Sequence, residues 1–590
     1  MAHELIHRNC RNFTALMLPR ILHCFPFACC ASTPSPRQRG SKPQVDVQHS
    51  RVRFISVMLL LLMAGFSSCR HNTTPANQTF SLNLSSGSLE SLDPAYAKDL
   101  YTMWTTHMIY NTLVEVDERL AVQPSLAKSW EVSEDGRHYI FHLQGNIFFQ
   151  DNEAFPGGKG RRLTAQDVVY SFARLINKSV ASSGAWIFND RADSTRPFTA
   201  RDDSTFELNL SRPFRPMLPM LSMPYCSIVP HEVAEKWGKD FRRHPCGTGP
   251  FRFSVWDEGT ALILHRNTTY WERDSTGAQL PYLSAVQLSF YDSKATEFLL
   301  FLQGKLDFVN GIDGSFKDLV LTKSGTLRPD FAAKYRLEKS TYLNTEYIGI
   351  LSDTANALMQ ASPLRYRLVR QAINYAIDRP RIARYFRNGV GIPASGGFIP
   401  YGLPGFDSTG AFGYHYNPAK AQQLLAEAGF PNGKGLGEIT FLTPDNWADI
   451  VNFICTELGE IGIRAKTEVM QPNILRQQMS ASAAPAFRAQ WIADYPDAET
   501  YLAVFNSRLP APPNYTRFKN AAFDKLYDES MAQPDSQRWQ AYRSMDSMAM
   551  QQAPVIPLFY DQLLHFTQLG VKGFSSNPMN LIELKRVRKY

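Results

Sequence analysis

The sequence lacks the signatures of several common protein classes. None of its eight cysteines forms a CxxC pair with another, so the sequence does not support a zinc ribbon or a thioredoxin-like redox site. Long hydrophobic runs are also scarce. The main one covers residues 54–66, near the amino terminus. This pattern excludes a protein that crosses a membrane many times.

Excess positive charge is also scarce outside the amino-terminal leader. Residues 1–68 carry +6 of the formal net charge of +8, so residues 69–590 carry only +2. Nucleic acid binding requires a concentrated basic surface to neutralise phosphates. The nearly neutral body therefore argues against nucleic acid as a partner.

The remaining composition is that of a globular protein, with 590 residues of which 44% are hydrophobic and 20% charged. Alternating apolar residues predict short strands at 80–84, 139–143, 206–210 and 261–265. Helical periodicity predicts helices at 100–114, 168–176, 364–377 and 448–461. Thr164 and Asp167 form a capping-box pattern, and Asn417 precedes Pro418 as an N-cap. Strands interleaved with helices indicate an α/β protein.

The leader resembles a lipoprotein signal. Arg51 and Arg53 precede the apolar run 54–66, and two serines then lead into Cys69. A transmembrane anchor is the alternative, but about 20 apolar residues are needed to span a bilayer. We therefore expect cleavage before Cys69 and lipid attachment there, with 69–79 as a polar tether. Residues 1–50 exceed what such a signal needs, which favours a start codon placed too far upstream.

Several segments, taken in order, carry a family resemblance. They are SLDP at 91–94, PSLAKSW at 124–130, LTAQDVVYSF at 163–172, GTGPF at 247–251, VRQAINYAIDR at 369–379 and WIADYPD at 491–497. Together they resemble the extracytoplasmic solute-binding proteins of peptide ABC transporters, the oligopeptide/dipeptide-binding family 5. The resemblance covers about residues 80–560.

This resemblance implies an α/β, two-lobed periplasmic-binding-protein fold, type II-like, with mixed sheets and a ligand cleft between the lobes. It places the first lobe at 80–339 with an inserted subdomain at about 116–204, the second lobe at 340–555, and a return to the first lobe at 556–590. The implied function is capture of short peptides by a monomer that delivers them to ABC permease subunits. Such a protein is not an enzyme and needs no cofactor or metal. The signal at Cys69 adds attachment to the periplasmic or cell-surface side of a bacterial membrane.

The resemblance also suggests ligand-binding residues. Asp494 matches the position that receives the α-amino group of a peptide, and an acidic group is the best partner for an ammonium ion. Asp494 as a helix cap is the alternative, but Asp497 is better placed to cap a helix beginning at Ala498. Trp491 is expected to line the cleft and to offer apolar surface to the ligand; packing in the core is the alternative. Arg488 occupies a position where a cation meets a ligand carboxylate, unless it is a surface arginine.

Two further pairs of residues are predicted from their places in the sequence. Tyr101 and Trp104, on the first predicted helix of the mature chain, are expected to face the cleft. Cys226 and Cys246 bracket the segment before the GTGP turn and are expected to form a disulfide in an oxidising compartment.

Other functions remain as alternatives. The same family fold also binds metal chelates, haem and oligosaccharides, so the fold alone does not determine the solute. Ser125 and Lys128 match the SxxK pattern of penicillin-recognising hydrolases, but no SDN motif accompanies them. Residues 3–7 form an HExxH pattern, although it lies upstream of the signal. His138 and His142 are expected to share the wetted face of a strand rather than to bind a metal.

Overall fold

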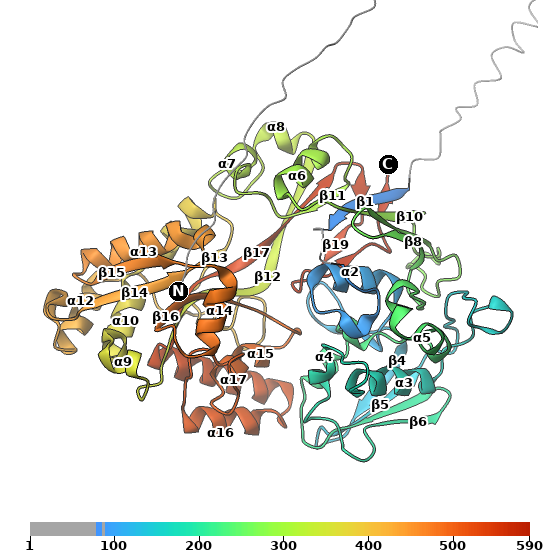
Figure 1. The fold of residues 1–590 in the computed structure, drawn as a ribbon, viewed down its shortest axis with the longest axis horizontal. Helices are drawn as coiled ribbons and strands as arrows, with labels where there is room; N and C mark the ends of the chain where they lie inside the picture. The colour runs from blue at the N-terminus through green and yellow to red at the C-terminus, as the bar shows by residue number, and fades with distance from the viewer. Residues whose placement is uncertain (1–77, 85–88) are drawn as a thin grey trace, which may run out of the picture. The chain divides into compact units, whose positions relative to one another are not determined.

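The computed structural model describes residues 78–84 and 89–590, which belong to one compact unit, Pro75–Tyr590 (Figure 1). The predictions for the leader, including lipidation of Cys69 and the 3–7 HExxH pattern, lie outside the described residues. Within the described ranges, every helix is too short or too polar to span a bilayer.

A four-stranded sheet contains the first described strand. Its order is β1 (Thr79–Leu84), β10 (Ala285–Phe290), β9 (Ala261–Arg266) and β8 (Phe251–Asp257), with β1 and β10 parallel and the other pairs antiparallel. The carboxyl terminus lies beside β1, because Gln78 Nε2 donates to the carbonyl of Lys589 at 2.9 Å and Lys589 Nζ donates to the carbonyl of Thr79 at 2.6 Å. The end of the chain thus lies next to its first described strand.

Helix α2 (Leu100–Ile109) is shorter than the predicted helix at 100–114. Asp99 caps it by accepting hydrogen bonds from the amides of Tyr101 and Thr102. The segment after it pairs as β2 (Val114–Val116) with β3 (Val122–Pro124). This hairpin contact, which uses β-branched valines, outweighs the helical pattern at the end of the predicted segment.

A second four-stranded sheet is antiparallel throughout. Its order is β4 (Ala127–Val132), β5 (His138–Leu143), β7 (Thr205–Asn209) and β6 (Phe198–Asp202). Helix α3 (Ala165–Ile176) covers it, with Phe172 against Phe198 and Phe206. The predicted capping box of Thr164 and Asp167 is confirmed.

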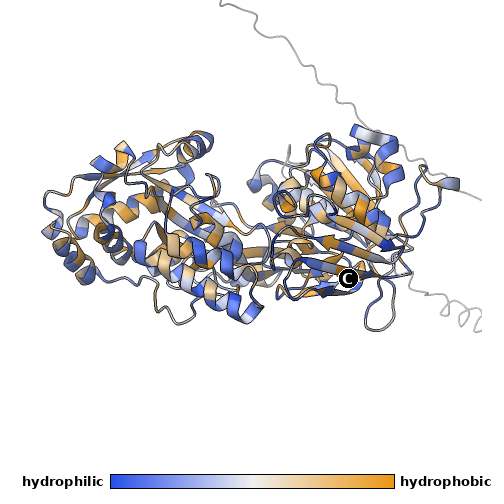
Figure 2. Ribbon diagram, turned by 90° about the horizontal axis from the view of Figure 1, so that it is seen from below, coloured by the Kyte–Doolittle hydropathy of each residue, from blue (hydrophilic) through white to orange (hydrophobic). Residues whose placement is uncertain are grey.

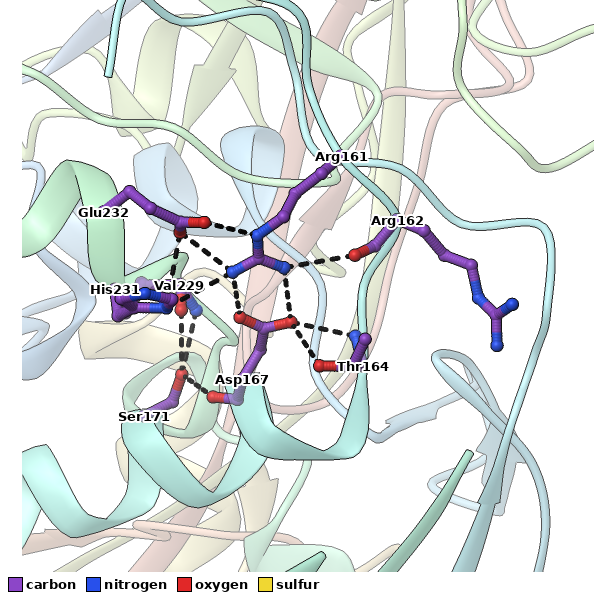
Figure 3. A network of polar contacts seen from close by, with 8 residues as sticks. All are labelled: Arg161, Arg162, Thr164, Asp167, Ser171, Val229, His231 and Glu232. Carbon is purple, nitrogen blue, oxygen red and sulfur yellow. Dashed lines mark hydrogen bonds and ion pairs between the residues drawn. The ribbon is translucent and has the colours of Figure 1, made fainter. Parts of the chain in front are cut away.

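An ion-pair network fixes the start of α3 (Figure 3). Both carboxylate oxygens of Asp167 accept from the guanidinium of Arg161, at 2.6 and 2.8 Å. The same guanidinium donates to both oxygens of Glu232 on α5 (His231–Trp237), at 2.5 and 2.8 Å. These hydrogen bonds raise the pKa of Arg161, so the cation that joins the loop before α3 to both helices is permanent.

The third sheet has seven strands. Along its main path the order is β11 (Phe308–Asn310), β17 (Val555–Gln568), β12 (Tyr335–Ile350), β16 (Ala486–Ile492), β14 (Glu438–Thr443) and β15 (Arg464–Val469), and β13 (Ile392–Pro393) pairs with β17. The long antiparallel pair β12 and β17 shifts register between Thr341 and Thr345, so the sheet changes its pairing part-way along both strands. Figure 1 shows these two strands as the longest in the molecule.

Helices cover this sheet and complete the core. Buried aliphatic residues of α10 (Arg367–Ala376), α12 (Pro418–Glu427) and α13 (Ala448–Glu460) pack with those of β12, β14 and β17. Asn417 caps α12 as predicted, by accepting from the amide of Lys420. After β16 come α15 (Glu499–Leu502), α16 (Ala521–Ser530) and α17 (Asp535–Gln552). Figure 2 shows hydrophobic residues gathered along the strands and hydrophilic residues on the outer turns of the helices.

The remaining short elements connect these layers. They are α4 (Met217–Met220), α6 (Lys294–Leu302), α7 (Lys317–Val320), α8 (Pro329–Ala332), α9 (Ala357–Ala361), α11 (Arg379–Arg381), α14 (Pro472–Ser480), β18 (Val571–Lys572), β19 (Ser575–Ser576), β20 (Ile582–Glu583) and β21 (Arg588–Lys589).

The parallel strands determine where a ligand site is to be sought. Strands β14, β15 and β16 run parallel, so they end at one edge of the sheet, at Thr443, Val469 and Ile492. Ligands of open α/β sheets bind outside the carboxyl ends of such strands. Asp494 lies two residues beyond the end of β16.

Candidate functional site

Asp494 is a carboxylate with no cationic partner among the described residues. Its side chain reaches solvent, yet protein atoms crowd around it, and this crowding raises the pKa of its carboxyl to about 6. A hydrogen bond with the Thr500 side chain offsets the rise only in part. A carboxylate in this state gains free energy from any cation that approaches it.

Tyr225 approaches Asp494 from a distant part of the chain. It lies in a short 3₁₀ turn, Pro224–Cys226, and its hydroxyl is 3.2 Å from that of Ser183. Burial and the negative charges of Asp494 and Asp99 raise the pKa of this hydroxyl. The Tyr225 hydroxyl therefore lies close enough to Asp494 to feel the charge of its carboxylate.

Trp491 and Asp494 share one partner. The indole nitrogen of half-buried Trp491 donates to Thr500 Oγ1 at 3.3 Å, and the Thr500 side chain also bonds with Asp494. Asp497 makes a different contact from Asp494: its carboxylate accepts a hydrogen bond from the amide of Glu499 at 2.9 Å. Asp497 thus holds the amide at the start of α15, but this helix begins at Glu499, one residue later than expected, and its N-cap is Ala498. Asp494 takes no part in this contact.

Arg488 is neither a surface residue nor an unpaired cation. Its side chain is 12% exposed, its Nη2 donates to Glu346 Oε2 at 2.5 Å, and its guanidinium lies 3.8 Å from the centre of the Trp447 ring. Burial lowers the pKa of Arg488 and raises that of Glu346 to about 7. Glu346 lies on the neighbouring strand β12, so the pair is an internal ion pair, and the surface alternative is wrong.

The prediction that Trp104 faces the ligand is not supported by the structure. Trp104 is 0% exposed, donates its indole N–H to the carbonyl of Asn580 at 2.6 Å, and packs against Phe308. An aromatic residue on α2 that faces β11 and the carboxyl-terminal loop belongs to the core. Tyr101 is half-buried with its ring edge-on to Trp104, at 5.5 Å between centroids, and its role at the ligand stays a prediction.

The predicted disulfide is wrong. Cys226 and Cys246 are free and buried. The Cys226 thiol lies near the carbonyl of Met220, whereas the Cys246 thiol lies 3.3 Å from the carbonyl of Gln150. Burial raises the pKa of both thiols, to about 12 for Cys246, so both stay protonated and inert.

We expect a reducing agent to leave the thermal unfolding temperature unchanged. A disulfide typically contributes about 2–4 kcal/mol, so its reduction would lower that temperature by several degrees. Differential scanning calorimetry with and without 5 mM dithiothreitol, at about neutral pH, checks this. A fall in the unfolding temperature would contradict the free-thiol assignment.

The alternative hydrolase and metal patterns do not assemble. Ser125 is buried whereas Lys128 is exposed, so the two do not share one site. His138 lies 2.6 Å from Asn209 Oδ1, and His142 pairs with Glu131 at 3.1 Å. In residues 78–84 and 89–590, no three His, Cys, Asp or Glu side chains are grouped to hold a metal ion.

Sequence reasoning missed cavities in the described part of the chain. One of about 990 Å³ is lined by residues of 90–98, 170–183 and 234–242, and two smaller ones lie elsewhere. One of about 570 Å³ lies at the carboxyl ends of β14 and β15, between 444–446 and 469–474, where Val469 and Ile474 expose their side chains. The other, of about 530 Å³, contains Lys585, whose ammonium lies 2.8 Å from Glu272 and 3.4 Å from Glu583. Neither shows in the sequence, because each combines loops that are distant along the chain.

Comparison with known proteins identifies the family. Residues 121–511 match the model described as "Bacterial extracellular solute-binding proteins, family 5 Middle". The chain belongs to this family. Solute-binding proteins of this kind serve ABC importers outside the cytoplasm, and they bind rather than transform their solutes.

Relatives of this solute-binding protein match 80% or more of its length. Heme-binding protein A of Haemophilus influenzae is 27% identical over 497 residues, which are 80% of this chain and 85% of the relative. Glutathione-binding protein GsiB of Escherichia coli O1:K1 is 24% identical over 502 residues, 83% of this chain and 90% of the relative. These two relatives are thus named for different solutes, haem and glutathione.

A solved structure supports the fold. The periplasmic binding protein DppA from Helicobacter pylori, in complex with the peptide STSA, matches with a TM-score of 0.68 and 24% identity, covering 87% of this chain and 98% of DppA. This solute-binding protein therefore has the two-lobed α/β periplasmic-binding fold that the sequence predicts. The resemblance stated from the motifs is confirmed as well.

Proposed function

We propose that this solute-binding protein captures short peptides by their free ammonium terminus and delivers them, chemically unchanged, to the permease of an ABC importer. The observation that carries the proposal is Asp494, a carboxylate whose pKa is raised to about 6 and which lacks a cationic partner among the described residues. A charge-assisted hydrogen bond to an ammonium ion contributes about 1.5–3 kcal/mol.

The surroundings of Asp494 suit such a ligand. Tyr225 and Trp491 offer aromatic surface beside it, and the cavity at 444–446 and 469–474 lies at the same edge of the sheet. Arg488 already pairs with Glu346, so within residues 488–494 the charge without an ionic partner is that of Asp494. We assign residues 80–339 to the first lobe and 340–555 to the second, with the ligand between them.

We also propose that the mature protein is a monomer attached to the membrane through lipid on Cys69, outside the cytoplasm. The support is the order of basic, apolar and small residues before this cysteine. Two or more acyl chains give stable attachment, because each buried CH₂ contributes about 0.8 kcal/mol.

Mass spectrometry of the solutes released by denaturing the purified mature protein tests the ligand class. A mixture of short peptides with free amino termini is the expected result. A single non-peptide solute, such as haem, would overturn the peptide proposal and leave the family unchanged. If nothing is released, titration with a tripeptide library in free and N-acetylated form decides, and equal binding of both forms would contradict the role of Asp494.

We expect peptide affinity to fall at acid pH. With a pKa of about 6, Asp494 is mostly ionised at pH 7 and about one-tenth ionised at pH 5, whereas the peptide ammonium stays charged over this range. The dissociation constant of a bound peptide should therefore rise about tenfold from pH 7 to pH 5. Isothermal titration calorimetry measures this rise, and a flat profile in the Asp494→Asn variant is the control.

A further inference from the structure

The first described residue of the chain lies against its last strand. Gln78 and Lys589 pair in both directions: Gln78 Nε2 donates to the Lys589 carbonyl at 2.9 Å, and Gln78 Oε1 accepts from the Lys589 amide at 3.4 Å. Figure 1 accordingly shows the carboxyl terminus next to β1. The last strand, β21 (Arg588–Lys589), pairs with β18 (Val571–Lys572), so this small sheet lies where the described chain begins.

Two cations lie opposite each other on this small sheet. Lys572 faces Arg588 in the register of β18 and β21, and directly opposed residues of antiparallel strands share one face of a sheet. Both side chains are exposed. Like charges in this arrangement repel each other and weaken the pairing of the strands. The sheet therefore gains stability from any anion that approaches this face.

The carboxylates around the sheet are already occupied. Asp307 pairs with Lys589 at 2.9 Å, and Glu272 pairs with Arg586 at 2.8 Å. Asp274 accepts hydrogen bonds from the hydroxyl of Tyr282 and from residues 276–278. Among residues 78–84 and 89–590, no carboxylate lies within ion-pair distance of Lys572 or Arg588.

An exposed aromatic residue extends the same face. The amide of Tyr590 donates to the carbonyl of Gly570 at 3.0 Å, so Tyr590 continues β21 two residues beyond Arg588 and, by the period of a strand, lies on its face. The side chain of Tyr590 is 77% exposed. The guanidinium of Arg588 lies 3.7 Å from the centre of the Tyr282 ring, which holds the cation in place. We call Lys572, Arg588 and Tyr590 the terminal face.

The length of chain before Gln78 limits what the terminal face can meet. Nine peptide units separate Cys69 from Gln78, and they span at most about 30 Å. A globular unit the size of Pro75–Tyr590 measures roughly 60 Å across. A chain attached to a membrane at Cys69 therefore keeps the terminal face near the bilayer and the opposite side of the molecule out of its reach.

We propose that the terminal face docks on anionic lipid headgroups and sets the orientation of the attached protein on its membrane. The argument from chain length rests on the proposed lipidation of Cys69, whereas the argument from charge does not. Anionic headgroups supply the counter-charge that Lys572 and Arg588 lack, and tyrosine is favoured at the boundary between membrane and water. Each cation held near an anionic surface strengthens binding roughly fivefold.

Hydrogen exchange of the lipidated protein in vesicles tests the docking. The probe is a vesicle of phosphatidylcholine with about 30% phosphatidylglycerol, compared with pure phosphatidylcholine. Amides in the peptides that cover 569–574 and 586–590 should exchange about tenfold more slowly on the anionic vesicles, whereas α12 (Pro418–Glu427) should not change. Salt at about 1 M should remove the difference, because it screens charges beyond about 3 Å. Equal exchange on both kinds of vesicle would overturn the proposal.

A charge-matched pair of variants locates the effect. In the mature chain without lipid, made by Cys69→Ser, Lys572→Gln with Arg588→Gln should weaken sedimentation with the anionic vesicles about 30-fold. Lys434→Gln with Lys519→Gln removes two exposed lysines from the part of the chain after β12 and should have no effect. Equal losses for the two pairs, or no loss for the first, would overturn the terminal face. The salt dependence of the unchanged protein needs no variant, so a variant that fails to fold does not remove the test.

The docking and the proposed function fail separately. Peptide capture takes no part in either readout, and mass spectrometry of the mature amino terminus reports acylation of Cys69 by itself. An acylated protein whose exchange is the same on both kinds of vesicle leaves the attachment standing and overturns the docking. A chain without acyl groups whose sedimentation still depends on Lys572 and Arg588 overturns the attachment and leaves the docking standing.

Discussion

Asp494→Asn is expected to weaken binding of trialanine by about 10- to 150-fold. This range corresponds to the loss of about 1.5–3 kcal/mol for a hydrogen bond to a charged group. Asparagine keeps the size of the side chain and one oxygen for the hydrogen bond with Thr500, so the variant removes the charge and little else. Isothermal titration calorimetry at pH 7 measures the change.

N-acetylated trialanine separates charge pairing from general damage. It should bind weakly to both proteins and with nearly equal affinity, since it carries no ammonium ion. Asp449→Asn, which changes an exposed carboxylate in the first turn of α13, is the matched control and should leave affinity unchanged. An Asp494→Asn protein that binds trialanine within about threefold of wild type, well below the 1.4 kcal/mol of a tenfold change, would show that Asp494 does not pair with the ammonium.

Features that depend on neighbours a few residues apart were predictable from the sequence. The capping box of Thr164 and Asp167, the cap at Asn417 and the bond from the Glu499 amide to Asp497 all join groups within four residues of each other. The family motifs are local in the same sense, since 491–497 brings Trp491 and Asp494 to the end of one strand. Such contacts depend on side chains and backbone amides a few residues apart, so they can be predicted without knowing the rest of the fold.

Long-range partners were not predictable. The Glu346 partner of Arg488 is 142 residues away, and the Asn580 carbonyl that buries the Trp104 indole is 476 residues away. Nothing in the pattern around Trp104 indicates which face of α2 meets the carboxyl-terminal loop. The disulfide prediction failed for the same reason, because sequence spacing does not determine whether two thiols face each other.

The electrostatic state of the site depends on both kinds of information. A motif locates Asp494, but the raised pKa of its carboxyl comes from burial by the surrounding protein, and the charge of Asp494 in turn raises the pKa of the distant residue Tyr225. Glu499 also depends on both kinds of information. The sequence predicts an acidic residue in the first turn of α15, and the structure shows that its buried carboxylate accepts hydrogen bonds from the hydroxyls of Tyr495 and Tyr527.

Arg538→Met is expected to lower the free energy of unfolding by about 3–5 kcal/mol. Arg538 is 5% exposed and donates to Asp497 and Asp535, each at 2.9 Å. Methionine fills a similar volume but leaves the carboxylate of Asp497 buried without a cation, and breaking a buried pair in this way has a cost of that size. Urea unfolding followed by tryptophan fluorescence measures the loss.

Arg508→Met is the matched control, because Arg508 forms a two-bond pair with Asp528 on α16 that is half exposed. It should lose less than about 1 kcal/mol. Adding Asp497→Asn to Arg538→Met should recover part of the loss, since the uncompensated charge is then removed. Equal losses for the two arginine variants would contradict the argument. Because Asp497 also holds the amide of Glu499 at the start of α15, the helix that carries Thr500, the same ion pair supports the position of Asp494.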